Sequence, residues 1–334
     1  MFQALSRRKR RGFLLGSAAL LVVAGLLLWW LGPAGPGDDE SPSGSVSFST
    51  GVTSGVYERY GQLLDSAAAK DMPDLDMRMI NSEGSQQNVR RVATGESDFT
   101  IAAADAVETY RRDGGPGADR LRGLARLYDD YVQLVVPRAS TIESVAGLRG
   151  KRVAVGQVGS GVRLIAERVL KAAGIDAGKD LDARPMAIDT TPAALERGEI
   201  DAFFWSGGLP TNAVRELSER FRIQFVPLGD LVDELHAQGG ASRYYRGSVM
   251  PADAYPAAQH GVAVDTVSVA NLLVTTDRAD PELTRGLTRT VIDSRDRIGA
   301  EVHAAQLVDL RTAPYTDPLP LHEGARRYYR SVKP

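Results

Sequence analysis

The chain has 334 residues, of which 43% are hydrophobic, so it can form two domains with apolar cores and does not resemble a disordered protein. It contains no cysteine, which excludes disulfide bonds, thiolate metal sites, cysteine nucleophiles and the lipidated cysteine of bacterial lipoproteins. Five of its 40 basic residues precede residue 32, so the rest of the chain has 35 basic and 42 acidic residues. This excess of acidic residues argues against a basic nucleic-acid-binding surface.

The first 31 residues form a separate segment. A basic run, Arg7 to Arg11, precedes nineteen uncharged, mostly apolar residues over 13–31. At about 1.5 Å per residue, a helix of this length nearly matches a hydrocarbon core of about 30 Å. The basic flank favours a cytoplasmic N-terminus, and Trp29 and Trp30 suit the outer interface. We therefore expect a transmembrane anchor that leaves the rest of the chain on the extracytoplasmic side.

Two alternatives remain open for this segment. A cleaved leader would need a small-residue site, for which the sequence offers only the surroundings of Ala34, so the uncleaved anchor is favoured. The run Arg10 to Leu14 also resembles a twin-arginine export signal, so the export route stays open between the general and the twin-arginine pathway. Residues 32–45 are rich in glycine, proline and serine and predict a flexible linker.

The pattern that follows alternates strands with helices, which predicts an α/β fold with mostly parallel strands. Ser54 is a possible N-cap of the first helix, and Gly95 is expected to end the second. The expected strands are 46–50, 76–80, 99–104, 131–136, 152–155, 202–205 and 266–275. Four expected helices cover 86–94, 141–149, 192–197 and 281–298, and two more begin at residues 56 and 161.

The pattern also occurs twice. Ser54 and Ser160 follow equivalent strands 106 positions apart, and Gly95 and Gly198, which open two Gly-Glu-x-Asp turns, are 103 positions apart. Two similar units predict two lobes with a ligand in the cleft between them. Strands near 131–137 and 266–275 would then connect the lobes as a two-stranded hinge. The expected division is residues 46–137 plus 266–334 for lobe 1 and 138–265 for lobe 2.

Both units place glycine and serine in a loop at a helix start, where backbone N–H groups and the helix dipole suit a carboxylate or phosphate. Ordinary strand-to-helix turn chemistry would explain either loop alone. Trp205 could form a wall of the cleft, and the glycines after it would let the backbone approach a ligand. Tyr57 and Tyr128 could each place a hydroxyl in the cleft, and Asp105 could meet a ligand amine or cap a helix. The candidate ligand-binding residues are Gly51, Thr53, Ser54, Tyr57, Ser85, Asp105, Gly159, Ser160, Gly161, Trp205 and Gly208.

Several kinds of chemistry find little support. The loop 156–161 lacks the glycine order of a dinucleotide site and the Lys-Ser/Thr ending of a phosphate loop. No Gly-x-Ser-x-Gly elbow is present, and all four histidines lie after residue 235 without metal-ligand spacing. We therefore expect no catalytic residue, no metal and no cofactor, and an enzyme is the least supported class.

The chain resembles the TAXI family of substrate-binding subunits of tripartite ATP-independent periplasmic (TRAP) transporters over about residues 45–330. The motifs that carry the resemblance are Gly51–Tyr57, Ser82–Asn88, Gly95–Asp98, Leu148–Gly161 and Gly198–Pro210. It implies a two-lobed type II periplasmic-binding-protein fold that captures a small organic anion or acidic amino acid for an ion-driven TRAP permease. It also implies that the site is lined by Thr53, Ser54, Tyr57, Ser85, Ser160, Gly161 and Trp205.

The bulky run Phe204-Trp205-Ser206 departs from the small residues often found there and leaves the ligand size open. No arginine in the cleft is evident from the sequence, so hydroxyl and N–H groups would hold an anion. A different class of function also stays open, a membrane-tethered sensor or scaffold that passes a binding event to a partner.

Overall fold

The computed structural model describes residues 42–332. The expected membrane anchor over 13–31 and most of the expected linker lie outside the described residues. Within residues 42–332, no helix is both long enough and apolar enough to cross a membrane.

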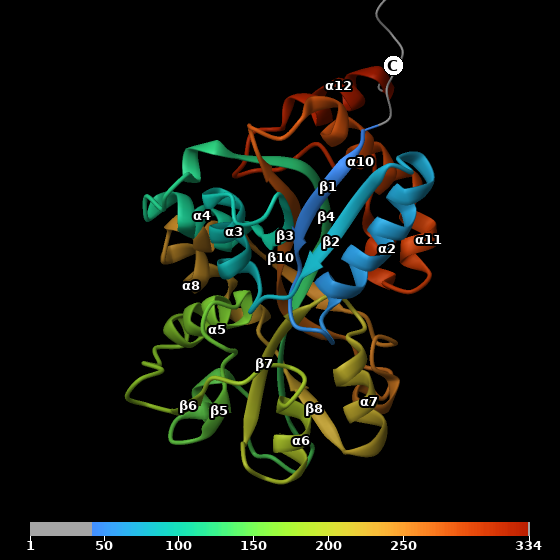
Figure 1. Cartoon of the computed structure of the whole chain (residues 1–334). Helices are drawn as coiled ribbons and strands as arrows, with labels where there is room; N and C mark the ends of the chain where they lie inside the picture. Colours follow the sequence, from blue (N-terminus) through green and yellow to red (C-terminus); the bar gives the residue numbers. More distant parts are fainter. Residues whose placement is uncertain (1–41, 333–334) are drawn as a thin grey trace, which may run out of the picture. The chain divides into compact units, whose positions relative to one another are not determined.

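The described chain is built around one sheet of ten strands (Figure 1). Eight strands follow the order β2-β1-β3-β10-β4-β7-β5-β6, while β8 pairs with β4 and β9 pairs with β10. The strands are β1 (Gly44–Ser49), β2 (Leu75–Ile80), β3 (Phe99–Ala103), β4 (Leu121–Pro137), β5 (Arg152–Ala154), β6 (Asp182–Arg184), β7 (Ala202–Gly207), β8 (Ile223–Val226), β9 (Tyr245–Met250) and β10 (Val264–Thr276).

Two long antiparallel strands, β4 and β10, join two groups of parallel strands. The first group is β1, β2 and β3, and the second is β5, β6 and β7. The first part of β4 pairs with β10, and its last residues pair with β7 and β8. Because strands within each group are parallel, their carboxyl ends and the loops that follow lie at one edge of the group.

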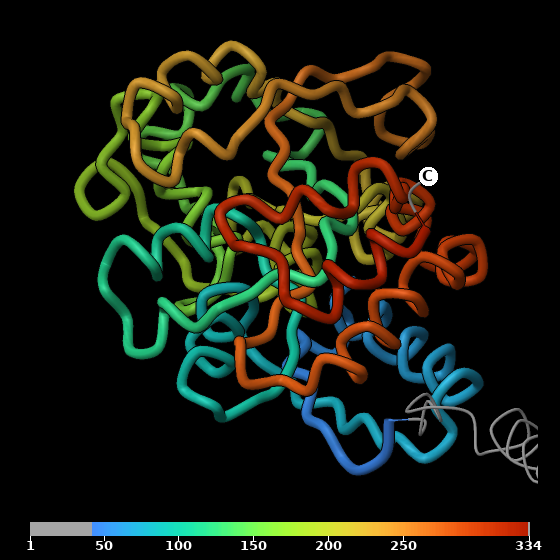
Figure 2. Tube along the Cα trace, turned by 90° about the horizontal axis from the view of Figure 1, so that it is seen from above, coloured from blue at the N-terminus to red at the C-terminus, as the bar shows by residue number. Residues whose placement is uncertain are grey.

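Helices cover both faces of the first group. The segments α2 and α10 share an apolar core with α12, and α3 and α4 contribute to a separate core on the other side of the sheet. Figure 2 shows the C-terminal segment, in red and orange, close to the N-terminal segment in blue, consistent with the packing of α10 against α2. The helices are α2 (Val56–Asp71), α3 (Ser85–Thr94), α4 (Ala104–Arg112), α5 (Gly161–Ala172), α6 (Thr191–Glu196), α7 (Asn212–Arg220), α8 (Val232–Ala237), α9 (Pro256–Gln259), α10 (Pro281–Asp293), α11 (Arg295–Gly299) and α12 (Glu323–Val332).

Two expected helices are corrected by the structure. The expected helix over 141–149 is a single 3₁₀ turn, Val145–Leu148, because Ser144 before it is extended and Gly150 after it is left-handed at φ 72°. The expected helix over 281–298 is divided into α10 and α11 at Ser294, whose hydroxyl donates to the Thr290 carbonyl.

Gly95 ends α3 in the left-handed conformation at φ 81°, as predicted.

Candidate functional site

A pocket lies between the loops that follow the strands of the two groups. Its walls come from the loop after β1, the start of α3, the loop before α5 and the end of β7, and residues of β4 and β10 also line it. Its cavity volume is about 80 Å³. Since a cavity needs only about 10–15 Å³ to hold one water, the pocket has room for several waters or a small organic molecule.

The pocket brings together most of the side chains and glycines that the sequence marks as candidates. Those that line it are Gly51, Tyr57, Ser85, Asp105, Ser160, Gly161 and Trp205. The others, Thr53, Ser54, Gly159 and Gly208, are not among the residues of its wall.

Thr53 and Ser54 are absent from the pocket wall because of the shape of the first loop. Thr53 and Ser54 are exposed on the outer side of a turn that the Gly55 amide closes by donating to the Val52 carbonyl over 2.8 Å. Gly55 is therefore the N-cap of α2, and no side-chain hydrogen bond caps this helix. The prediction that Ser54 caps the helix is wrong, because the turn places the start of α2 one residue later than its counterpart in the second unit.

The second loop caps its helix as serine typically does. The Ser160 hydroxyl accepts from the Arg163 amide over 3.0 Å and donates to the Gln157 carbonyl over 2.7 Å. Its hydrogen-bonding capacity is thus largely used within the loop. Among the described residues, the amides of Gly161 and Val162 have no protein acceptor, and both residues line the pocket. The donors that this loop offers to a ligand are therefore backbone amides.

The second loop also touches α3 and the loop before it across the pocket. The Gln86 side chain donates to the Ser160 carbonyl over 2.6 Å, and the Gln87 amide donates to the Gly159 carbonyl over 3.1 Å. Gln157 donates to the Glu83 carbonyl over 3.3 Å. These three bonds use neutral groups and hold the two walls of the pocket together.

From the pocket wall, a chain of hydrogen bonds leads to Asn271 on β10. The Ala103 amide donates to the Ser85 hydroxyl over 3.1 Å, and Ser85 lies 3.0 Å from the Tyr57 hydroxyl. Tyr57 donates to Oδ1 of Asn271 over 2.5 Å. Because Asn271 accepts with its oxygen, its Nδ2 group is directed away from Tyr57. This amide nitrogen has no hydrogen-bond partner among the described atoms.

Asp130 on β4 lines the pocket and is 4% exposed. Its Oδ1 has no hydrogen-bond partner among the described atoms. Burial raises the pKa of this carboxyl to about 7, although the neighbouring Asn271 amide and Tyr57 hydroxyl act in the opposite direction. Near neutral pH the group can therefore gain or lose a proton.

Asp105 at the start of α4 also lines the pocket and is 1% exposed. Its Oδ2 accepts from Arg168 over 3.0 Å and from the Tyr245 hydroxyl over 2.7 Å, while Oδ1 has no partner among the described atoms. Burial raises the pKa of this carboxyl, and Arg168 opposes that shift. One oxygen is thus fixed by the protein and the other is left open.

The remaining candidates are held by contacts within the protein. The Trp205 indole donates to the Thr211 hydroxyl over 2.8 Å, which fixes the ring in the wall. Gly208 is buried, and a Cβ there would come within 2.6 Å of Ala304. Tyr128 packs against Tyr60 with ring centroids 5.8 Å apart and does not line the pocket.

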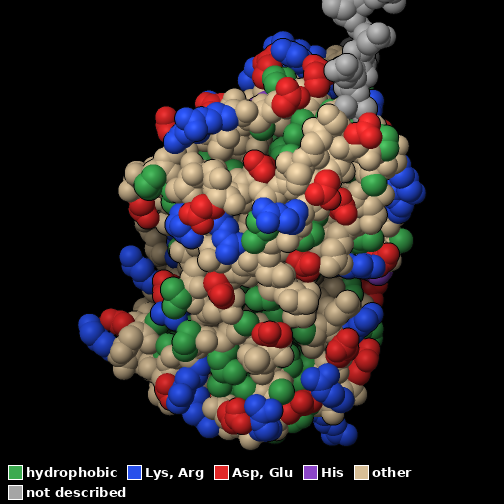
Figure 3. Space-filling model, in the orientation of Figure 1, with side chains coloured by type: hydrophobic (Ala, Val, Ile, Leu, Met, Phe, Trp, Pro, Cys, Tyr) green, Lys and Arg blue, Asp and Glu red, His purple; other side chains and the backbone are tan. Residues whose placement is uncertain are grey.

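Three important residues were missed by the sequence analysis: Asp130, Asn271 and Arg168. The available clue was the pair of adjacent acidic residues, Asp129 and Asp130, in the middle of the strand that forms β4. The residues that line the pocket include Glu83, Asp105 and Asp130 but no lysine, arginine or histidine. Within residues 42–332 no group of three or more potential ligands could hold a metal ion. On the face shown in Figure 3, basic and acidic side chains are interspersed, without a large basic patch.

The comparisons with known proteins agree on the fold. The model of the NMT1-like family matches residues 48–332. A structure of a protein from Bordetella bronchiseptica RB50 is 17% identical, with 89% of this chain and 91% of that chain covered and a TM-score of 0.51. A protein from Listeria monocytogenes, provisionally described as an L-cystine ABC transporter, is 12% identical, with 79% and 98% covered and a TM-score of 0.50. The fold is thus an α/β fold of the periplasmic-binding-protein kind.

Proposed function

The chain belongs to the NMT1-like family, and from this we propose that it is a solute-binding protein of a membrane transporter. It captures a small polar organic molecule in the pocket between the two strand groups and delivers it to a permease. The proposal assigns residues 46–137 and 266–334 to one lobe and 138–265 to the other, with β4 and β10 as the hinge.

One observation carries this proposal: a pocket enclosed by two separate strand groups and lined by loop backbone from both. Gly51 and Gly84 come from the first group, and Gly156 and Gly161 come from the second. Movement of one group relative to the other about two connecting strands would open such a pocket and close it around a solute. A site of this kind binds and releases a molecule without needing a nucleophile or a general base.

The pocket offers two kinds of hydrogen-bonding group. The free amides of Gly161 and Val162 suit a carboxylate, which supports the expected class of small organic anions and acidic amino acids. The carboxylates of Asp105 and Asp130 suit a donor. A ligand that carries both a carboxylate and a hydrogen-bond donor satisfies the pocket better than a ligand with acidic groups alone.

We base the proposed partner and location on the sequence. An ion-driven TRAP permease is the partner that the TAXI resemblance implies. The apolar segment over 13–31 supports a membrane-anchored protein whose binding region is extracytoplasmic. An anchor would keep the binding protein near its permease.

Thermal-shift screening of the full chain in detergent against amino acids, organic acids and sulfonates tests the proposal. A ligand at 100 times its dissociation constant stabilises the folded state by about 2.7 kcal/mol. Trp205→Ala should weaken binding of the ligand that the screen identifies. Tyr315→Ala, which changes an exposed aromatic residue outside the pocket, should leave that binding unchanged. A screen without hits, or a hit that Trp205→Ala leaves unchanged, contradicts the proposal.

A further inference from the structure

Two carboxylates in the pocket each leave one buried oxygen without a hydrogen bond. Oδ1 of Asp105 and Oδ1 of Asp130 have no partner among the described atoms, although the two residues are 1% and 4% exposed. Leaving such an oxygen unpaired away from water is costly. Both residues line the pocket, so their carboxylates lie beside the space that a bound molecule would occupy. The missing hydrogen bonds therefore indicate a property of the ligand.

The surrounding charges do not neutralise these carboxylates fully. Arg168 pairs with Oδ2 of Asp105, and its side chain is 16% exposed. Asp130 has only neutral groups close by, the Asn271 amide and the hydroxyls of Tyr57 and Tyr128, apart from the acidic neighbours Asp105 and Asp129. Since the wall of the pocket includes no basic side chain, the pocket carries excess negative charge.

We propose that the ligand carries a cationic nitrogen, an ammonium or amidinium group, which donates hydrogen bonds to the open oxygens of Asp105 and Asp130. This inference rests on the proposed function and narrows the class of solute. An ammonium group has three N–H donors and no acceptor, which matches two carboxylate oxygens that lack a hydrogen bond. A molecule with acidic groups alone would face like charge in a buried site. Amino acids fit the pocket, and simple dicarboxylates do not.

The size of the preference follows from the kind of bond. Hydrogen bonds between charged groups are shorter than neutral ones and about twice as strong. Loss of one such bond typically weakens binding by about 10- to 100-fold. We expect a preference of this size for an amine over a molecule of the same length that lacks it.

Calorimetric titration of the full chain in detergent with matched compounds tests the inference. Glutarate, 5-aminopentanoate and 1,5-diaminopentane share a five-carbon chain and differ only in their charged ends. The panel also pairs L-amino acids with the corresponding 2-hydroxy acids. Binding should be confined to compounds with an amine, each at least about tenfold tighter than its counterpart.

Asp130→Asn should reduce the preference for the amine by about 10- to 100-fold, because the amide cannot pair with a cation as a carboxylate does. The matched control is Asp129→Asn, next to it on β4, since Asp129 pairs with Arg126 over 2.6 Å and is not part of the pocket wall. Thermal melting of both variants checks that they fold. If Asp130→Asn fails to fold, the preference of the unmodified protein for the amine in each matched pair still tests the inference.

The outcomes separate this inference from the proposed function. If an acid without an amine binds as tightly as its amine counterpart, the inference is wrong and solute binding stands. Tight binding of acids alone likewise overturns the inference and leaves solute binding in place. If no compound in either screen binds, both proposals fail.

Discussion

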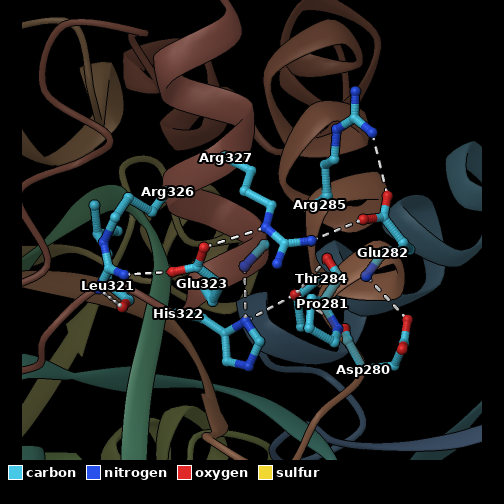
Figure 4. Close-up of polar contacts among 11 residues, drawn as sticks. Asp280, Pro281, Glu282, Thr284, Arg285, Leu321, His322, Glu323, Arg326 and Arg327 are labelled. Atoms are coloured by element: carbon cyan, nitrogen blue, oxygen red, sulfur yellow. Dashed lines mark hydrogen bonds and ion pairs between the residues drawn. The ribbon is translucent and has the colours of Figure 1, made fainter.

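Two clusters of buried polar groups in this protein differ in how completely the protein satisfies them. In the cluster between α10 and α12, the Thr284 hydroxyl lies 2.8 Å from Nδ1 of His322, which also accepts from the Gly324 amide over 3.2 Å (Figure 4). At the exposed edge of this cluster, Glu323 pairs with Arg327 over 3.1 Å. In the pocket, by contrast, Asp105 and Asp130 each leave an oxygen without a partner.

The difference indicates which cluster is structural and which one binds. Buried polar groups in folded proteins nearly always find partners, so a cluster that is satisfied internally needs nothing else. A cluster with open acceptors at the wall of a pocket is completed by a molecule from outside. If this comparison is right, changes in the first cluster alter stability alone, whereas changes in the second also alter ligand affinity.

The largest effect is expected from Arg168→Met, which removes the cation that holds Asp105. A buried charge left without its partner typically costs about 3 kcal/mol or more of the free energy of unfolding. Urea denaturation measures this loss. The control is Arg163→Met on the same helix, whose pair with Glu167 is partly exposed and is worth less than about 1 kcal/mol. Equal losses for the two variants would contradict the role of Arg168.

His322→Ala should lower the free energy of unfolding by about 2 kcal/mol, because it removes the acceptor of the buried Gly324 amide. The affinity for the ligand should not change, since His322 is not in the pocket wall. Urea denaturation and calorimetry on the same sample measure both quantities. A loss of affinity without a loss of stability would reverse the assignment of the two clusters.

Tyr57→Phe should weaken ligand binding by about tenfold, because it removes the hydroxyl that orients Asn271. Calorimetry measures the affinity, and thermal melting checks the fold. Tyr315→Phe, at an exposed position, serves as the control and should leave affinity unchanged. Equal affinities of Tyr57→Phe and the unmodified protein would show that this hydrogen-bond chain does not support the site.

The smallest effect is expected from Gln86→Ala, which removes one neutral hydrogen bond between the walls of the pocket. A bond of this kind is worth about 1 kcal/mol, so the affinity should fall by about fivefold, mainly through faster dissociation. Stopped-flow dissociation kinetics measure the rate. Gln62→Ala, whose side chain bonds Glu58 within α2, should leave the rate unchanged. An unchanged rate in Gln86→Ala would mean that the bond does not contribute to closure.

Local patterns in the sequence predicted much of the first strand group and the order of both units. Gly95 ends α3 as expected, because a left-handed C-cap depends on one residue and its immediate neighbours. Asp130 could not be placed in the pocket from the sequence, because its position depends on the pairing of β4 with β10, where it lies opposite Val269. The same applies to Arg168, which meets Asp105 only after α5 packs near α4.

The sign of the proton exchange on ligand binding tests the central claim most directly. Burial raises the pKa of Asp130 to about 7, and a cation beside the carboxylate lowers it again, so binding near pH 7 should release a proton. Calorimetry in buffers of different ionisation enthalpy, with the tightest-binding amine of the five-carbon panel, measures this exchange. We predict proton release and an affinity that rises with pH between about 6 and 8, both absent in Asp130→Asn. Proton uptake, or an affinity that falls over the same range, would contradict a cationic ligand at Asp130.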